Sequence, residues 1–178
     1  AYRVVSGAVR ICKLMSDGRR QIEAFRLPGD IFGIELGDSH RFTAEAIADS
    51  VVRLVRRGAV IGFATRDAEA ARSLWALATR DLERAQEHVL LLGRKTAQER
   101  VASFLLGLAR TSACTTGGRA DQAIEIPMSR QDIADYLGLT IETVSRTLTQ
   151  LEAAGLIALH TARHVALCDR AALRGLNG

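Results

Sequence analysis

The chain has 178 residues, of which 48% are hydrophobic, and a formal net charge of +4 at neutral pH. This length and apolar fraction suffice for one or two domains with a sizeable core. The excess of basic over acidic residues, with a pI near 9.4, permits a nucleic-acid partner without requiring one. No run of about 18 uncharged apolar residues is present, so no membrane span is predicted.

The cysteines and histidines do not follow a metal-binding pattern. Cys12, Cys114 and Cys168 are far apart and odd in number, which argues against a disulfide framework and predicts a reducing, cytoplasmic location. His160 and His164 are four residues apart but flank an apparent hairpin turn, so we expect surface positions rather than ligands. The prediction is that the chain uses no metal and no other cofactor.

Residues 1–66 are predicted to form a sensor-like β-roll. Glycines separate short β-branched runs, residues 16–19 predict a hairpin turn, and residues 42–55 predict two strands. Many short strands with glycine turns favour a small barrel or roll. The chain shows no signal peptide and opens at Ala1, inside a strand-like run, so we expect the β-roll to lack its N-terminal part.

Residues 67–110 predict a long helix followed, after Gly93, by a second one. Apolar side chains recur at heptad spacing over about three heptads, which favours a helix that pairs with a second copy over one that packs only on its own domain. The residues of this predicted dimer seam are Ala71, Trp75, Ala78, Leu82, Ala85, Val89 and Leu92.

Residues 111–178 predict a connection followed by a helix-turn-helix. The polar, glycine-rich stretch 111–122 is read as the connection. Ser129 is a good N-cap with Asp132 three residues later, and Gly138 suits the left-handed end of a short helix. The inner face of that helix is expected to consist of Ile133, Ala134 and Leu137.

A second helix and a hairpin complete the predicted winged domain. Thr140 can cap a helix that runs to about Ala154 and is stopped by Gly155. Its apolar stripe contains Val144, Leu148 and Leu151. Two apolar runs follow around residues 161–163 and predict a two-stranded wing. Two short helices joined by a tight turn form a helix-turn-helix, whose second helix enters the major groove of DNA.

The polar stripe of the second helix is predicted to read DNA bases. A solvated face would show the same spacing, but the surrounding motif favours a reading surface. Arg146 has the fork that fits guanine, Glu142 can accept from a cytosine amino group, and Ser145 lies on the same stripe. Contacts to the DNA backbone are expected from Ser129, Arg130, Thr140, Thr143, Thr149 and Arg163.

The whole chain resembles the CRP/FNR family of transcription regulators. The motif MSRQDIADYLGLTIETVSRTLTQLE at 128–152 is similar to the family's signature, and the runs at 6–35 and 91–106 resemble the FixK subgroup. The resemblance implies an α+β architecture with a β-roll, a long dimerisation helix and a C-terminal winged helix-turn-helix. It also implies a homodimer that binds a TTGA…TCAA inverted repeat, contacts bases through Glu142, Ser145 and Arg146, and works with RNA polymerase. Such regulators mostly activate genes of low-oxygen or nitrogen metabolism.

Departures from the family pattern concern its ligands. Members that bind cyclic AMP carry a longer cassette between a ribose-binding Glu and a phosphate-binding Arg, whereas Glu35 and Arg41 are only six residues apart and Phe42 stands where those members have Ser. Members with an iron–sulfur cluster use a cysteine at the position of Arg53, and a cation cannot replace a thiolate ligand. We therefore expect neither cyclic-nucleotide binding nor a cluster.

The input signal stays open between several alternatives. A ligand-gated sensor of the same family could bind haem or another small molecule, with His40 and His88 as candidate axial ligands by residue type alone. A regulator competent without ligand could respond to its own abundance or to oxidation of Cys168 or Cys114. A small-molecule-binding β-roll with a docking tail is disfavoured by the short cassette, and no catalytic motif predicts an enzyme.

Overall fold

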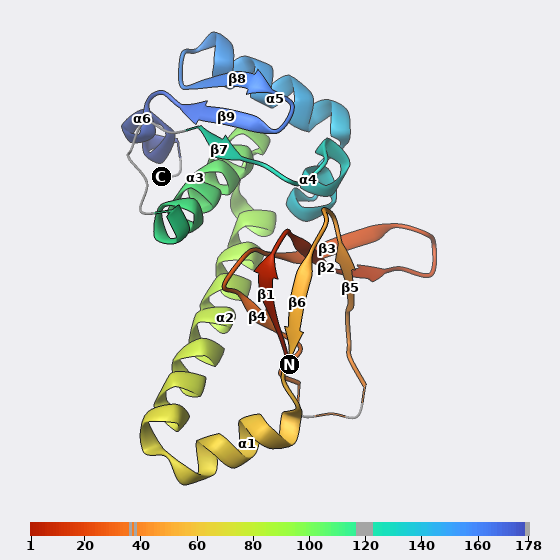
Figure 1. The fold of residues 1–178 in the computed structure, drawn as a ribbon. Helices are drawn as coiled ribbons and strands as arrows, with labels where there is room; N and C mark the ends of the chain where they lie inside the picture. Colours follow the sequence, from red (N-terminus) through yellow and green to blue (C-terminus); the bar gives the residue numbers. More distant parts are fainter. Residues whose placement is uncertain (36, 38, 117–122, 177–178) are drawn as a thin grey trace. The chain divides into compact units, whose positions relative to one another are not determined.

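Short strands build two three-stranded antiparallel sheets at the start of the chain in the computed structural model, with strand orders β4-β1-β6 and β3-β2-β5 (Figure 1). The structure describes residues 1–35, 37, 39–116 and 123–176, the side chains of 112–116 excepted. The strands are β1 (Tyr2–Ser6), β2 (Val9–Leu14), β3 (Arg20–Arg26), β4 (Ile31–Phe32), β5 (Thr43–Ala46) and β6 (Val51–Leu54).

Gly7 divides the first apolar run into two strands. The run YRVVSGAVRICKL reads as one strand, but the structure breaks it into β1 and β2 at Gly7, whose φ is +82°. A Cβ at Gly7 would lie 2.3 Å from Asp49 O and from Ser50 Oγ, so only glycine fits. The Ser50 hydroxyl accepts a hydrogen bond from Ala8 N at 3.1 Å and fixes the break.

The core of the β-roll forms where the two sheets face inward. Val4, Val9, Ile11 and Phe32 are buried together, and the Tyr2 ring stacks on Phe32 with centroids 5.2 Å apart. The predicted hairpin turn at 16–19 connects β2 and β3, and β5 and β6 are the two strands predicted within 42–55. The sequence prediction of a β-roll is therefore confirmed.

Helix α1 (Arg57–Arg66) is missing from the sequence prediction, which placed these residues in the β-roll. The helix has no side chain that caps its N-terminus and no acidic residue in its first turn. None of its residues, all of which the structure describes, is buried. The usual sequence signals of a helix start and of a core-facing stripe are therefore absent.

Helix α2 (Ala68–Arg94) has one face attached to the β-roll. On that face Ala70 and His88 are buried, and Asp81 forms an ion pair with the nearly buried Arg26, with Arg26 Nη1 2.8 Å from Asp81 Oδ1. Arg84 reaches Asp30 in the turn before β4 at 3.3 Å. These contacts hold the N-terminal unit, Ala1–Leu90, together.

The second unit, Leu91–Gly178, contains the winged helix-turn-helix. Its elements are α3 (Ala97–Thr116), β7 (Ile124–Glu125), α4 (Arg130–Leu137), α5 (Ile141–Ala153), β8 (Ile157–Thr161), β9 (His164–Leu167) and α6 (Arg170–Gly175). The strands form one sheet in the order β7-β9-β8. Helix α3 extends to Thr116, so the stretch expected to begin as a connection at residue 111 is helical at first. Strand β7 was not predicted.

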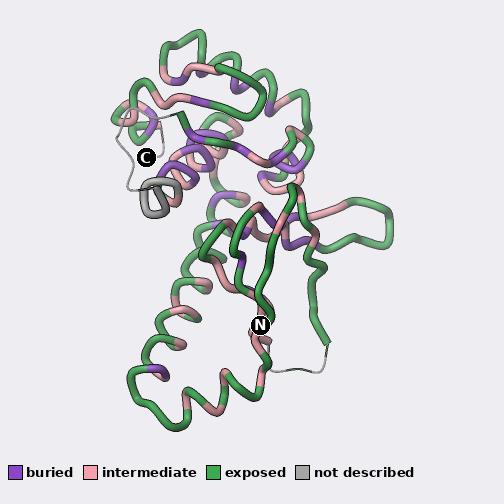
Figure 2. The backbone as a smooth tube through the Cα atoms, in the orientation of Figure 1, coloured by how far each residue is buried: buried purple, intermediate pink, exposed green. Residues whose placement is uncertain are grey.

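The core of the second unit joins α3 to the helix-turn-helix. Figure 2 shows buried segments on α3, α4 and α5. Ala102, Leu105, Leu137 and Leu151 are each at most 1% exposed. Because α3 supplies part of this core, it packs with the helix-turn-helix of its unit. None of the described helices has the length and apolar content needed to span a bilayer. The domain boundaries predicted from the sequence, after residues 66 and 110, stay a proposal.

Candidate nucleic-acid interface

Side chains cap both helices of the helix-turn-helix. The Ser129 hydroxyl accepts from Asp132 N at 3.0 Å, and Ser129 N donates to the Asp132 carboxylate at 3.1 Å, which together form a capping box. Gly138 adopts the left-handed conformation at φ +61° and ends α4. Thr140 caps α5 by accepting from Thr143 N at 3.2 Å. The predicted caps are confirmed.

Replacing Asp132 by alanine should destabilise the second unit by about 1–2 kcal/mol, because the first turn of α4 loses its reciprocal cap. Asp132 is only 4% exposed, so water replaces the lost bonds poorly. Urea unfolding measures the change, with the exposed Gln150→Ala as the control. Equal stability of the two variants would contradict a stabilising role for the box.

Helix α5 separates a buried face from an exposed one. Val144, Thr147, Leu148 and Leu151 are its buried residues. The opposite stripe of Glu142, Ser145, Arg146 and Thr149 is exposed. The structure therefore places the predicted base-reading residues together on the outer face of one helix, which is the arrangement that a recognition helix requires.

The three predicted base-reading side chains differ in how they are held. Arg146 makes no hydrogen bond or ion pair with the described residues, so its guanidinium is available to a ligand. Hydrogen bonds from the backbone N–H of Glu142 and from the Thr140 hydroxyl lower the pKa of Glu142, which stays ionised at neutral pH. The Ser145 hydroxyl donates to Ile141 O at 2.9 Å, so it meets a base as an acceptor or must rotate to donate.

Four of the predicted backbone-contacting residues, Ser129, Arg130, Thr140 and Thr143, lie at the N-termini of α4 and α5. Ser129 and Thr140 are the two N-caps, and Thr143 Oγ1 lies 3.1 Å from the Thr140 hydroxyl. Burial lowers the pKa of the Arg130 guanidinium, and its Nη1 finds no hydrogen-bond partner among the described residues. Helix N-termini attract phosphate, so these positions suit a DNA backbone.

The wing is joined to the recognition helix. The Glu152 carboxylate, near the end of α5, accepts from Leu159 N in β8 at 2.8 Å. Arg163 is exposed in the turn between β8 and β9, and its N–H donates to the Thr161 hydroxyl at 3.1 Å. The Thr149 hydroxyl donates to Ser145 O at 3.2 Å. Sequence spacing does not reveal the hydrogen bond between Glu152 and Leu159 N, because the two residues lie in different elements.

The predicted dimer seam is the exposed face of α2. Trp75, Leu82 and Val89 are 76%, 58% and 70% exposed, which is unusual for large apolar side chains at regular spacing. Ala78 and Ala85 are exposed between them, while Ala71 and Leu92 are half-buried. This face differs from the one that carries Ala70, Asp81 and His88.

The ligand-related positions of the β-roll are engaged with one another or exposed. His40 Nδ1 lies 2.9 Å from the Glu35 carboxylate, and Arg41 and Phe42 are exposed. Arg53 stands directly opposite Arg3 in the β1–β6 pairing. Among the described residues, no group of three or more His, Cys, Asp or Glu side chains could hold a metal ion.

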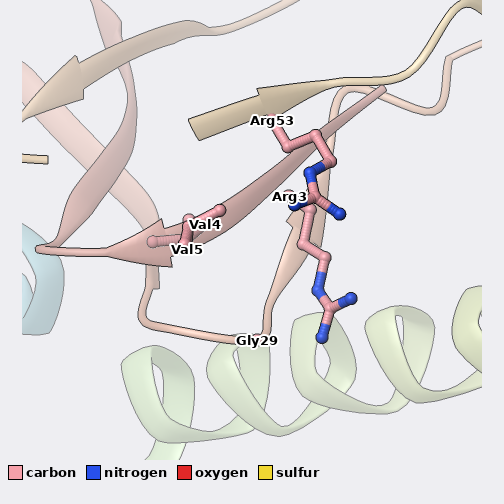
Figure 3. A pocket seen from close by; sticks show the side chains of 5 residues that line it. All are labelled: Arg3, Val4, Val5, Gly29 and Arg53. Atoms are coloured by element: carbon pink, nitrogen blue, oxygen red, sulfur yellow. The ribbon is translucent and has the colours of Figure 1, made fainter. Parts of the chain in front are cut away.

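A pocket of about 250 Å³ is lined by Arg3, Val4, Val5, Gly29 and Arg53. Figure 3 shows the two arginine side chains projecting from neighbouring strands, with Gly29 in the turn nearby. The pocket is open to solvent, because Arg3, Val5 and Arg53 are exposed. Two guanidinium groups at opposed positions repel each other, and an anion between them would relieve that repulsion.

The cysteines differ in environment. Cys12 is buried, and desolvation together with the Glu45 carboxylate raises the pKa of its thiol, so it stays protonated at neutral pH. Cys168 is exposed after β9, where its N–H donates to Leu156 O at 2.9 Å. The side chain of Cys114 lies outside the described residues. A redox role for Cys168 or Cys114 stays a prediction.

Comparisons with known proteins agree with this architecture. The family model of cyclic nucleotide-binding domains matches residues 1–67, and that of Crp-like helix-turn-helix domains matches residues 99–176. The nitrogen fixation regulation protein FixK of Azorhizobium caulinodans is 60% identical over 176 residues, which are 99% of this chain and 71% of that protein. FixK of Rhizobium meliloti is 48% identical, over 98% of this chain and 77% of that protein.

A solved structure extends the similarity to the fold. FixK2 from Bradyrhizobium japonicum has a TM-score of 0.91 and 52% identity, covering 99% of this chain and 86% of that one. These relatives are regulators rather than enzymes by name. The two matched domains, the α+β architecture and the identity to FixK proteins lead to one conclusion: the chain belongs to the CRP/FNR family of DNA-binding transcription regulators and is FixK-like.

Proposed function

We propose that this DNA-binding regulator recognises a TTGA…TCAA-type inverted repeat as a homodimer and activates genes of low-oxygen or nitrogen-related metabolism together with RNA polymerase. The observation that carries the proposal is the outer stripe of α5, where Glu142, Ser145 and Arg146 are exposed together on the side opposite its buried face. Arg reads guanine O6 and N7, and Glu accepts from the amino group of cytosine.

The exposed face of α2 supports the proposed homodimer. Large apolar side chains alternate with alanine along this face, and a second copy of the same helix would cover them. Two recognition helices related by a twofold axis match the two halves of an inverted repeat.

The dimer is proposed to bind DNA without a cyclic nucleotide or an iron–sulfur cluster. Glu35, expected at the ribose-binding position by family resemblance, contacts His40 instead, and the phosphate-binding cassette is short. Arg53 stands, by family resemblance, at the position of a cluster ligand, and it lies opposite Arg3 in the strand pairing. In an alternative, a small effector gates the regulator. The pocket between Arg3 and Arg53 favours this candidate, with an anion as effector.

Fluorescence anisotropy of the purified protein without added ligand tests the proposal. We expect the TTGA…TCAA palindrome to bind about a thousandfold more tightly than a scrambled duplex of equal length at one fixed salt concentration. Equal weak binding to both duplexes would contradict ligand-free recognition. Recovery of specific binding on adding haem or a small phosphate anion would then favour the gated alternative.

A further inference from the structure

The Arg100 guanidinium, in α3, holds three separate pieces of backbone in the second unit. Its Nε donates to Lys95 O at 2.9 Å, and its Nη2 donates to Leu92 O at 2.9 Å. Its Nη1 donates to Leu137 O at 2.8 Å and to Gly138 O at 3.4 Å. One side chain therefore bonds the end of α2, the α2–α3 junction and the turn of the helix-turn-helix.

The four acceptors explain why a guanidinium occupies this place. Leu92 and Leu137 lie in the last turns of α2 and α4, where carbonyl groups have no partner within the helix. The C-terminal ends of helices also carry partial negative charge, which favours a cation. Arginine offers five N–H donors in a planar fork, whereas lysine has a single nitrogen that cannot reach this set of carbonyls.

Packing at the same place leaves little freedom. A Cβ added to Gly138 would lie 3.1 Å from Leu92 Cδ2 and 3.4 Å from Arg100 Nη1. The turn between α4 and α5 is therefore in close contact with the last residues of α2. All of these residues belong to the unit Leu91–Gly178.

We propose that Arg100 is a positioning residue that fixes the end of α2 to the helix-turn-helix and so sets the distance between the two recognition helices of the dimer. The proposal rests on the proposed function, in which α2 pairs with its copy. Half-sites on DNA lie about 34 Å apart, which is one helical turn. If the distance between the two recognition helices does not match this spacing, the affinity for the DNA falls. Arg100 thus makes the regulator selective for the spacing of half-sites as well as for their sequence.

The test uses the full chain and a series of palindromes whose half-sites are moved apart or together by one and two base pairs, at one salt concentration. We expect wild type to have one optimum spacing. In Arg100→Met, which keeps the apolar stem, the preference for that spacing over its neighbours should fall by about tenfold. Preference for TTGA over a mutated half-site at the optimum spacing should remain, because α5 is unchanged.

Two further variants separate positioning from folding. Arg94→Met removes an exposed guanidinium from the end of α2 and should keep the wild-type spacing profile. Arg100→Lys keeps the charge but loses the planar set of N–H donors, so it should also flatten the dependence of affinity on half-site spacing. It replaces Arg100→Met as the test variant if the methionine variant does not fold. An unchanged ratio between spacings in a folded Arg100 variant, whether affinity is retained or uniformly reduced, would overturn the proposal. Failure of wild type to prefer the palindrome over scrambled DNA would instead refute the proposed function.

Discussion

Leu82→Asp should convert the proposed homodimer to a monomer and reduce affinity for the palindrome by about a hundredfold or more, because two linked half-site contacts become independent ones. Leu82 lies at the middle of the exposed apolar face of α2 and is 58% exposed in the single chain. In a paired helix the two aspartates would be buried near each other without partners, which opposes association strongly. Sedimentation measures the association state, and anisotropy measures the affinity.

The matched control for this experiment is Ser73→Asp. It adds the same charge to α2 at an exposed position on the side of the helix opposite Leu82. We expect it to remain dimeric and to bind the palindrome with affinity near that of wild type. A Leu82→Asp protein that stays dimeric and binds normally would exclude this face of α2 as the dimer seam.

Arg146→Ala should cost about 1–3 kcal/mol of binding free energy per half-site and relax base preference, because a bidentate contact to guanine is lost. The Arg146 side chain is exposed and forms no hydrogen bond or ion pair with the described residues. The variant should therefore unfold at the wild-type urea concentration. Anisotropy with palindromes that differ at the guanine position measures the lost discrimination.

Arg163→Ala is the contrasting variant for base readout. Arg163 lies in the wing turn, where we propose a contact to the DNA backbone. Loss of this contact should reduce the affinity for all DNA sequences by the same factor and lower the dependence of affinity on salt. If Arg146→Ala also weakened the matched and the altered palindromes by the same factor, Arg146 would not read a base.

Local signals were sufficient to predict the helix-turn-helix. Ser129, Gly138 and Thr140 determine where α4 and α5 begin and end, because caps act within one turn of the chain. The apolar spacing of α5 identified Val144, Leu148 and Leu151 as its buried face. Helix α1 escaped prediction because it carries neither caps nor a buried stripe. The end of α3 escaped because its polar sequence resembles a connection.

Contacts between distant segments set the limit for predicting the site. The outer stripe of α5 could be predicted because it follows from helical period alone. Arg100 could not, because its acceptors are main-chain carbonyls up to 38 residues away and carbonyls carry no sequence signature. The bond between Glu152 and Leu159 N in the wing was missed for the same reason.

The separation of the two faces of α5 has a consequence for how such regulators can diversify. Substitutions at Glu142, Ser145 or Arg146 alter only exposed atoms, whereas the packing of the helix depends on the opposite face. Surface changes of this kind usually alter stability by less than about 0.5 kcal/mol. A duplicated gene could therefore acquire a new operator preference in one or two mutational steps, while Glu152 keeps the wing in register with the altered helix.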